Sequence, residues 1–142
     1  MSVRNLDHLF APHSVAVIGA SIRPHSVGAT VLRNLLAGGF KGPVYPVNPK
    51  YDTLCGLRTY PGVDALPEAP GLAIICTPAA TVPGIVGQLG AAGTRAAIIL
   101  SAGLGAVKDA QGRTLKQAAL DAARPYVLRL LGPNCVGLLV PG

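Results

Sequence analysis

Apolar runs of strand length recur along the chain, and each is closed by glycine, proline or asparagine. Most are apolar at every position, which is typical of strands covered on both faces in a parallel sheet. Five runs of this kind predict strands at residues 14–19, 43–48, 72–76, 96–100 and 127–131. A weaker segment near residues 57–60 is expected to add a short strand at the edge of the sheet.

Segments with a helical period lie between these runs. The first spans residues 27–36 and stops at Gly38-Gly39; the second, weakened by glycine, spans residues 83–92. A third helix is expected to start at Asp109 and to end before Pro125. Strand and helix alternate, which predicts an α/β fold with a doubly wound, parallel, Rossmann-like sheet of strand order 3-2-1-4-5-6. We expect one domain over residues 1–142, forming the N-terminal part of a longer protein.

Composition narrows the classes of partner. Twelve Lys and Arg against six Asp and Glu give a net charge of +6, which favours an anionic partner. The positive residues are scattered from Arg4 to Arg129 and form no cluster interleaved with aromatic residues, so nucleic acid is not expected. The uncharged run 69–94 is interrupted by prolines and glycines, so we expect no membrane span.

The residues able to perform catalysis are few and scattered. Cys55, Cys76 and Cys135 form no CxxC or Cys/His pattern, which argues against a metal site or a disulfide framework and favours a cytoplasmic location. No histidine lies near Cys135 in the sequence to activate it, and no Ser/His/Asp order or paired carboxylates occur. We therefore expect no catalytic residue in this chain.

A glycine turn follows the first predicted strand. Gly19, Ala20 and Ser21 come directly after it, and a helix is expected to start near Gly28. Glycine allows the backbone to approach a phosphate, and the free N–H groups of a helix start attract an anion, so this unit predicts phosphate binding. The turn is longer than GxGxxG and identifies no single cofactor; a tight turn without a ligand is the alternative.

A cation follows the second predicted strand. Sites for NAD place Asp or Glu here to hold the ribose 2′-hydroxyl, whereas this chain has Asn48, Pro49 and Lys50. A lysine at this point suits a phosphate on the ribose, as in NADP or in the 3′-phosphate of coenzyme A. A loop lysine exposed to solvent, with no ligand, is the alternative.

Small and polar residues follow three more strands, at Thr77-Pro78, Ser101-Ala102-Gly103 and Asn134. Ligands of open α/β sheets lie beyond the carboxyl ends of the strands, where the strand order reverses. The predicted order puts this point between strands 14–19 and 72–76, so the glycine turn and Thr77-Pro78 should face each other.

Taken together, these stretches resemble the N-terminal coenzyme A-binding domain of ADP-forming acyl-CoA synthetases, which is similar in turn to the alpha subunit of succinyl-CoA synthetase. The matching stretches run in order over nearly the whole chain: residues 9–12, 14–21, 27–28, 34–36, 39–40, 44–51, 77–79, 99–103 and 131–137. The same module also resembles the front part of some multidomain protein acetyltransferases, where a regulatory role is the alternative to catalysis.

The resemblance implies that coenzyme A or acyl-CoA lies across the carboxyl edge of the sheet. It implies phosphate contacts at Gly19, Ala20, Ser21 and Gly28, adenosine contacts at Asn48, Pro49 and Lys50, and contacts to the pantetheine arm at Thr77, Pro78, Ser101, Ala102, Gly103 and Asn134. Relatives often carry Pro-Gly-Lys-Val-Gly where this chain has residues 24–28, which leaves Arg23 or His25 as the local cation.

In the family, the complete enzyme converts acyl-CoA, ADP and phosphate to the free acid, ATP and coenzyme A through a phosphohistidine on the following domain. None of the three histidines of this chain matches that residue. The function implied is a coenzyme A-binding domain that is not catalytic alone, with the remaining domains or subunits of a synthetase or acetyltransferase as its partners. An NADP-binding domain of an oxidoreductase and a non-enzymatic, nucleotide-sensing regulatory module are the alternatives.

Overall fold

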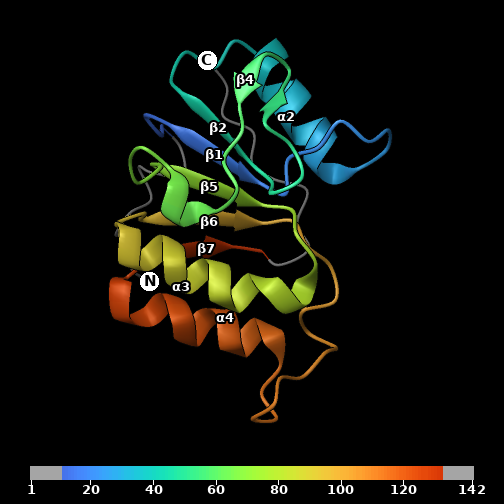
Figure 1. Ribbon diagram of the computed structural model, residues 1–142. Coiled ribbons are helices and arrows are strands. Elements are labelled where there is room, and N and C mark those ends of the chain that lie inside the picture. Colours follow the sequence, from blue (N-terminus) through green and yellow to red (C-terminus); the bar gives the residue numbers. More distant parts are fainter. Residues whose placement is uncertain (1–10, 133–142) are drawn as a thin grey trace.

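A parallel five-stranded sheet forms the centre of the computed structural model, which describes residues 11–132 (Figure 1). Its strands are β1 (Val15–Ile18), β2 (Val44–Val47), β5 (Leu72–Ile75), β6 (Ala96–Ile99) and β7 (Arg129–Leu131). They pair in the order β2-β1-β5-β6-β7, all in parallel. Every residue of β1, β5 and β6 is buried, as their uniformly apolar sequences predict. The predicted Rossmann-like α/β class is confirmed.

The predicted third strand is not a strand of this sheet. Residues of that segment form an antiparallel hairpin of β3 (Thr53–Leu54) and β4 (Leu57–Arg58). Between residues 11 and 132, one parallel bridge, Val47 to Tyr60, joins the segment to the edge of β2. The physical reason is the two-residue turn at Cys55 and Gly56, whose φ angles are 52° and 78° and which closes a tight hairpin. The rest of the predicted order, 2-1-4-5-6, agrees with the observed sheet.

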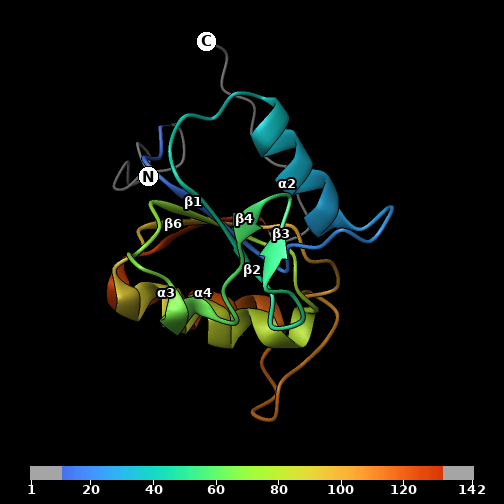
Figure 2. The same cartoon turned by 45° about the horizontal axis from the view of Figure 1, so that its top comes forward.

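Helices cover the two faces of the sheet (Figure 2). Helix α2 (Val27–Ala37) lies on one face, whereas α3 (Val82–Ala92) and α4 (Leu115–Ala123) lie side by side on the other. Short 3₁₀ turns are the remaining helical elements of the described chain, at η1 (Val63–Ala65), η2 (Ala79–Thr81) and η3 (Arg124–Tyr126). The first two helices confirm the predicted segments closely.

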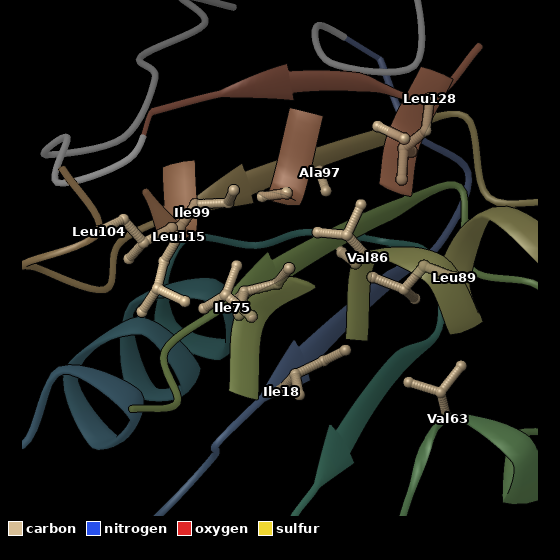
Figure 3. Packing of buried hydrophobic residues seen from close by; sticks show 14 of the residues in the cluster. Ile18, Val63, Ile75, Val86, Leu89, Ala97, Ile99, Leu104, Leu115 and Leu128 are labelled. Atoms are coloured by element: carbon tan, nitrogen blue, oxygen red, sulfur yellow. The ribbon is translucent and has the colours of Figure 1, made fainter. Parts of the chain in front are cut away.

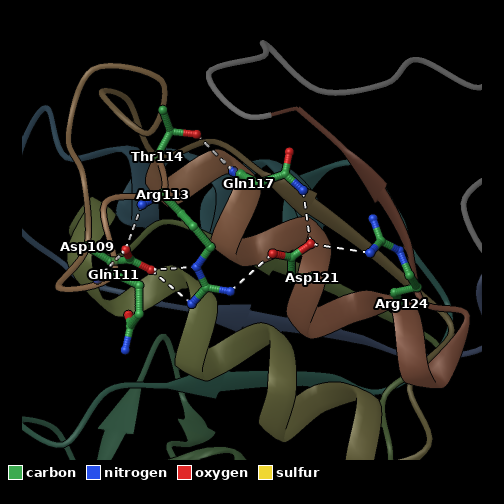
Figure 4. Close-up of polar contacts among 7 residues, drawn as sticks. All are labelled: Asp109, Gln111, Arg113, Thr114, Gln117, Asp121 and Arg124. Atoms are coloured by element: carbon green, nitrogen blue, oxygen red, sulfur yellow. Dashed lines mark hydrogen bonds and ion pairs between the residues drawn. The ribbon is translucent and has the colours of Figure 1, made fainter.

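The third helix starts later than predicted. Thr114 caps it, with Oγ1 accepting a hydrogen bond from the N–H of Gln117 at 3.1 Å. Asp109, predicted to open the helix, instead lies in a preceding turn, where Oδ1 accepts from the N–H groups of Gln111 and Arg113 (Figure 4). The carboxylate therefore stabilises a turn by capping free backbone N–H groups there.

The larger part of the core lies between the sheet and helices α3 and α4 (Figure 3). Ile18, Ile75 and Ile99 point from three neighbouring strands toward Val86 and Leu115 of the helices. Each fully buried aliphatic side chain contributes about 1.5–3 kcal/mol through the hydrophobic effect. This packing holds the carboxyl ends of the strands in place. Within residues 11–132, no helix has the length and apolar character needed to cross a bilayer.

Candidate functional site

A groove of about 860 Å³ opens at the carboxyl edge of the sheet, where β1 ends between β2 and β5. The strand order reverses here: the chain passes from β1 to β2 on one side and returns to β5 on the other. Open α/β sheets bind ligands at this point, and the volume is in the range of known ligand pockets, about 300–1,000 Å³.

Glycine brings the start of α2 onto the end of β1. A Cβ atom at Gly28 would lie 2.0 Å from the carbonyl oxygen of Gly19, so no larger residue fits without moving the backbone. Gly19 itself has a φ of +91°, and a Cβ there would lie 3.0 Å from the carbonyl carbon of Cys76. The helix therefore begins directly at the groove. Val27 and Gly28, the first two residues of the helix, line the groove. The first N–H groups of a helix have no hydrogen-bond acceptor within the helix, so they favour a bound anion.

Ser26 fixes this helix start. Its Oγ accepts from the N–H of Ala29 at 3.2 Å and donates to the carbonyl oxygen of Arg23 at 2.9 Å. Ser21 holds the other side of the loop, because its Oγ accepts from the N–H of Arg23 at 2.9 Å. The long loop between β1 and α2 is thus tied by serine hydroxyls at both ends.

The loop after β2 is joined to the glycine turn. The N–H of Gly19 donates to the carbonyl oxygen of Val47 at 2.9 Å, and Asn48 Nδ2 donates to the carbonyl oxygen of Ala20, also at 2.9 Å. Asn48 Oδ1 in turn accepts from the N–H of Lys50 at 2.9 Å. Lys50 is exposed and lines the groove.

The charge of the groove is positive. Arg23, His25 and Lys50 line it, and among the described residues no Asp or Glu does. Because no carboxylate neutralises Arg23 and Lys50 within the groove, it favours a ligand with negative charge.

Cys76 also lines the groove, where its side chain is partly buried. Burial of the side chain raises the pKa of Cys76 to about 12, because the low-polarity surroundings disfavour the thiolate. The exposed Cys55 lies at the tip of the hairpin and is not among the residues of the groove. Burial thus disfavours the thiolate of Cys76, and Cys55 lies away from the groove.

Most of the residues that the sequence predicts as binding residues line the groove. Those that line it are Gly19, Ser21, Gly28, Asn48, Pro49, Lys50, Thr77 and Pro78. Ala20, the middle residue of the glycine turn, is fully buried. Ser101, Ala102 and Gly103 lie outside the lining, and Ser101 Oγ donates to the carbonyl oxygen of Thr77. Asn134 and Cys135 fall outside the described residues.

One wall of the groove had no signal in the sequence analysis. It is formed by Pro61, Gly62 and Val63, with Ile85 and Gln88 from α3. Tyr51 was also missed as a site residue; its hydroxyl lies 3.5 Å from Ser21 Oγ. These residues come from a loop, a 3₁₀ turn and a helix face, and only the folded chain brings them together.

The parallel sheet, the glycine turn against a helix start and the cationic groove at the strand-order reversal define a Rossmann-like, nucleotide-binding α/β domain. The family model described as CoA binding domain matches residues 13–141, and the chain belongs to this family. It is a CoA-binding domain of the kind that forms one part of ADP-forming acyl-CoA synthetases.

Two curated relatives and one solved structure show the relationship. The chain is 41% identical to acetate–CoA ligase [ADP-forming] I of Archaeoglobus fulgidus, over 94% of this chain and 19% of that protein. It is 35% identical to the alpha subunit of acetate–CoA ligase [ADP-forming] I of Pyrococcus furiosus, over 95% of this chain and 30% of that subunit. A solved acetyl-CoA synthetase 1 from Ca. Korarchaeum cryptofilum, in complex with phosphate and ADP, superposes with a TM-score of 0.84 at 40% identity, over 93% of this chain and 28% of that one. The chain thus spans less than a third of the length of each.

Proposed function

We propose that this chain binds coenzyme A or acyl-CoA in the groove at the carboxyl edge of the sheet, as one domain of an ADP-forming acyl-CoA synthetase. The observation that carries the proposal is the cationic groove between the glycine turn and the Lys50 loop, together with membership of the CoA-binding family. Coenzyme A carries a pyrophosphate and a 3′-phosphate, so it matches a groove with cations on two separate loops.

The residues present fit this ligand. The pyrophosphate would lie at the glycine turn and the start of α2, where Arg23 supplies positive charge and His25 also lines the groove. Lys50 would hold the 3′-phosphate, and the wall of Pro61, Val63 and Ile85 offers apolar contacts for the rest of the ligand. These assignments, and the placement of the pantetheine arm by Ser101, Ala102, Gly103 and Asn134, stay predictions.

The domain would contribute binding and not bond breaking. When bound, coenzyme A supplies the thiol that carries the acyl group. This chain would hold it, because burial keeps Cys76 protonated and the sequence has no Ser/His/Asp order or paired carboxylates. Catalysis would then require the other domains or subunits of the synthetase, which make up most of the length of the relatives. A cytoplasmic location and a single domain over residues 1–142 belong to the same proposal.

Calorimetric titration of the 142-residue chain with coenzyme A and with NADPH tests the proposal, because both ligands carry a phosphate on the ribose. We expect saturable one-site binding of coenzyme A and no binding of NADPH at the same concentrations. Binding of NADPH without coenzyme A would replace the proposal with an oxidoreductase domain. Binding of neither ligand would refute both functions.

A further inference from the structure

We propose that Asn48 is a positioning residue that acts on coenzyme A through Lys50 and does not bind the ligand with its own amide. This inference rests on the proposed function and deepens it. In NAD sites the side chain at the end of the second strand reaches outward to the ribose hydroxyls. Here the side chain at that place is turned toward the protein at both ends.

The contacts of Asn48 join the two loops that border the groove. Nδ2 donates to the carbonyl oxygen of Ala20 in the glycine turn, and Oδ1 accepts from the N–H of Lys50, each at 2.9 Å. The backbone N–H of Asn48 donates to the carbonyl oxygen of Tyr60 at 2.9 Å, which ties the same residue to a third segment. Rotation of the amide toward a ligand would break the two side-chain hydrogen bonds together.

The hydrogen bond to Lys50 matters because the ammonium group stands on a long, flexible stem. Lysine is a mobile point charge, and holding it over one phosphate costs side-chain entropy. An Asx turn fixes the backbone of residue 50 and so limits the region that the ammonium can reach. The link to Ala20 then sets this region relative to the glycine turn. Asn48 therefore couples the position of Lys50 to the glycine turn, beside the backbone hydrogen bond from Gly19 to Val47.

The test measures dissociation constants for coenzyme A and for dephospho-coenzyme A, which lacks only the 3′-phosphate. We expect the wild-type chain to prefer coenzyme A by about tenfold, the effect of one charge-assisted contact. Lys50→Ala should abolish the preference. Asn48→Ala should reduce it at least threefold, and the double variant should show no smaller preference than Lys50→Ala alone, because the two residues act on the same phosphate.

Two further variants sharpen the result. Lys41→Ala is the matched control: it removes the same charge, but Lys41 lies before β2 and Lys50 after it, so Lys41 is at the opposite edge of the sheet. The preference of Lys41→Ala for coenzyme A over dephospho-coenzyme A should equal that of the wild-type chain. In Asn48→Ser, the hydroxyl still accepts from the N–H two residues on, while the link to Ala20 is lost. This variant should bind both ligands more weakly, with a preference for coenzyme A between those of Asn48→Ala and the wild-type chain.

The outcomes separate the inference from the function on which it rests. Failure of the wild-type chain to bind coenzyme A refutes the proposed function. If the wild-type chain prefers coenzyme A and Lys50→Ala loses the preference, an unchanged preference in Asn48→Ala overturns the inference alone. An equal loss for both ligands in Asn48→Ala would assign Asn48 a purely structural role. Should Asn48→Ala not fold, an unchanged preference in Asn48→Ser would overturn it.

Discussion

Gly28 packs against Gly19 so closely that a Cβ atom on Gly28 would lie 2.0 Å from the carbonyl oxygen of Gly19. The first turn of α2 rests on the end of β1 because neither residue carries a side chain there. Gly28→Ala must push the helix away from the strand, and we expect a loss of about 2 kcal/mol in unfolding free energy, measured by urea denaturation. Binding of coenzyme A should weaken as well, since the helix start moves.

Gly84→Ala is the matched control for that variant. Gly84 lies in α3, and a Cβ there would meet nothing within 4 Å. Alanine is the better helix former, so this variant should gain about 0.5–1 kcal/mol. Equal stability of Gly28→Ala and the wild-type chain would show that the loop adapts freely and that the close contact is unimportant.

Arg23→Ala tests the assignment of the pyrophosphate to the loop between β1 and α2. Coenzyme A and dephospho-coenzyme A share the pyrophosphate, so the variant should weaken both by a similar factor of about three to ten. Isothermal titration of the two ligands measures it. A selective loss for coenzyme A would place the 3′-phosphate, and not the pyrophosphate, at this loop.

The pKa of Cys76 predicts its reactivity. Because burial raises this pKa to about 12, the thiolate fraction at pH 8 is on the order of 1 in 10,000, and alkylation should rise about tenfold per pH unit. Iodoacetamide labelling with mass spectrometry should show slow reaction at Cys76 and faster reaction at the exposed Cys55. Equal rates at pH 8 would contradict the burial of the thiol.

The same shift affects stability at alkaline pH. The ordinary pKa of the thiol is 9.0, so the unfolded chain releases the proton before the folded chain does. The contribution of Cys76 to stability is complete below about pH 9 and is lost as the pH rises toward 12. Cys76→Ala should therefore lose less stability over this range than the wild-type chain does.

Arg113 holds the segment before α4 through ion pairs to two carboxylates (Figure 4). Its guanidinium contacts Asp109 at 2.9 Å and Asp121 at 3.1 Å. Desolvation alone would raise the pKa of Asp109, but hydrogen bonds from the backbone and side chain of Arg113 outweigh it and lower this pKa. A hydrogen bond from Gln117, together with Arg113 and Arg124, lowers the pKa of Asp121.

Arg113→Ala should loosen this segment without unfolding the domain. We expect faster hydrogen exchange at the N–H of Gln111, which donates to Asp109, and unchanged exchange in β5 and β6. Lys116→Ala, an exposed change on the following helix α4, should leave the exchange unaltered. Because both carboxyl pKa values are lowered, the stabilisation is present above the ordinary value of 3.8 and is lost as the pH falls through the lowered values. Exchange at Gln111 equal to that of the wild-type chain would show that Arg113 does not hold the turn.

The centre of the sheet could be predicted because β1, β5 and β6 are buried on both faces and so are uniformly apolar. The start of α4 also had a signal that was overlooked: Thr114 and Gln117 fit the S/T-x-x-E/Q pattern of a helix start, and Thr114 does cap the helix. The hairpin at β3 and β4 could not be predicted, because its turn places Cys55 at a positive φ, where Asn or Gly is usual. The residues around the turn therefore give little sequence signal for this hairpin.

The candidate site could likewise be predicted only in part from the sequence. The glycine turn and Lys50 could be predicted, because they directly follow strands and their chemistry depends on residue type. The wall around Val63 and Ile85 could not, because its residues are distant in the sequence and carry no motif. The role of Asn48 was also hidden, since only the folded chain shows that both ends of its amide contact protein atoms.

A crystal structure of the chain grown with coenzyme A tests the central claim most directly. We predict electron density for the pyrophosphate at Gly19 and the start of α2, with the 3′-phosphate within hydrogen-bond distance of Lys50 Nζ. Density for coenzyme A at another surface, or a groove filled by the protein's own side chains at saturating ligand, would contradict the account.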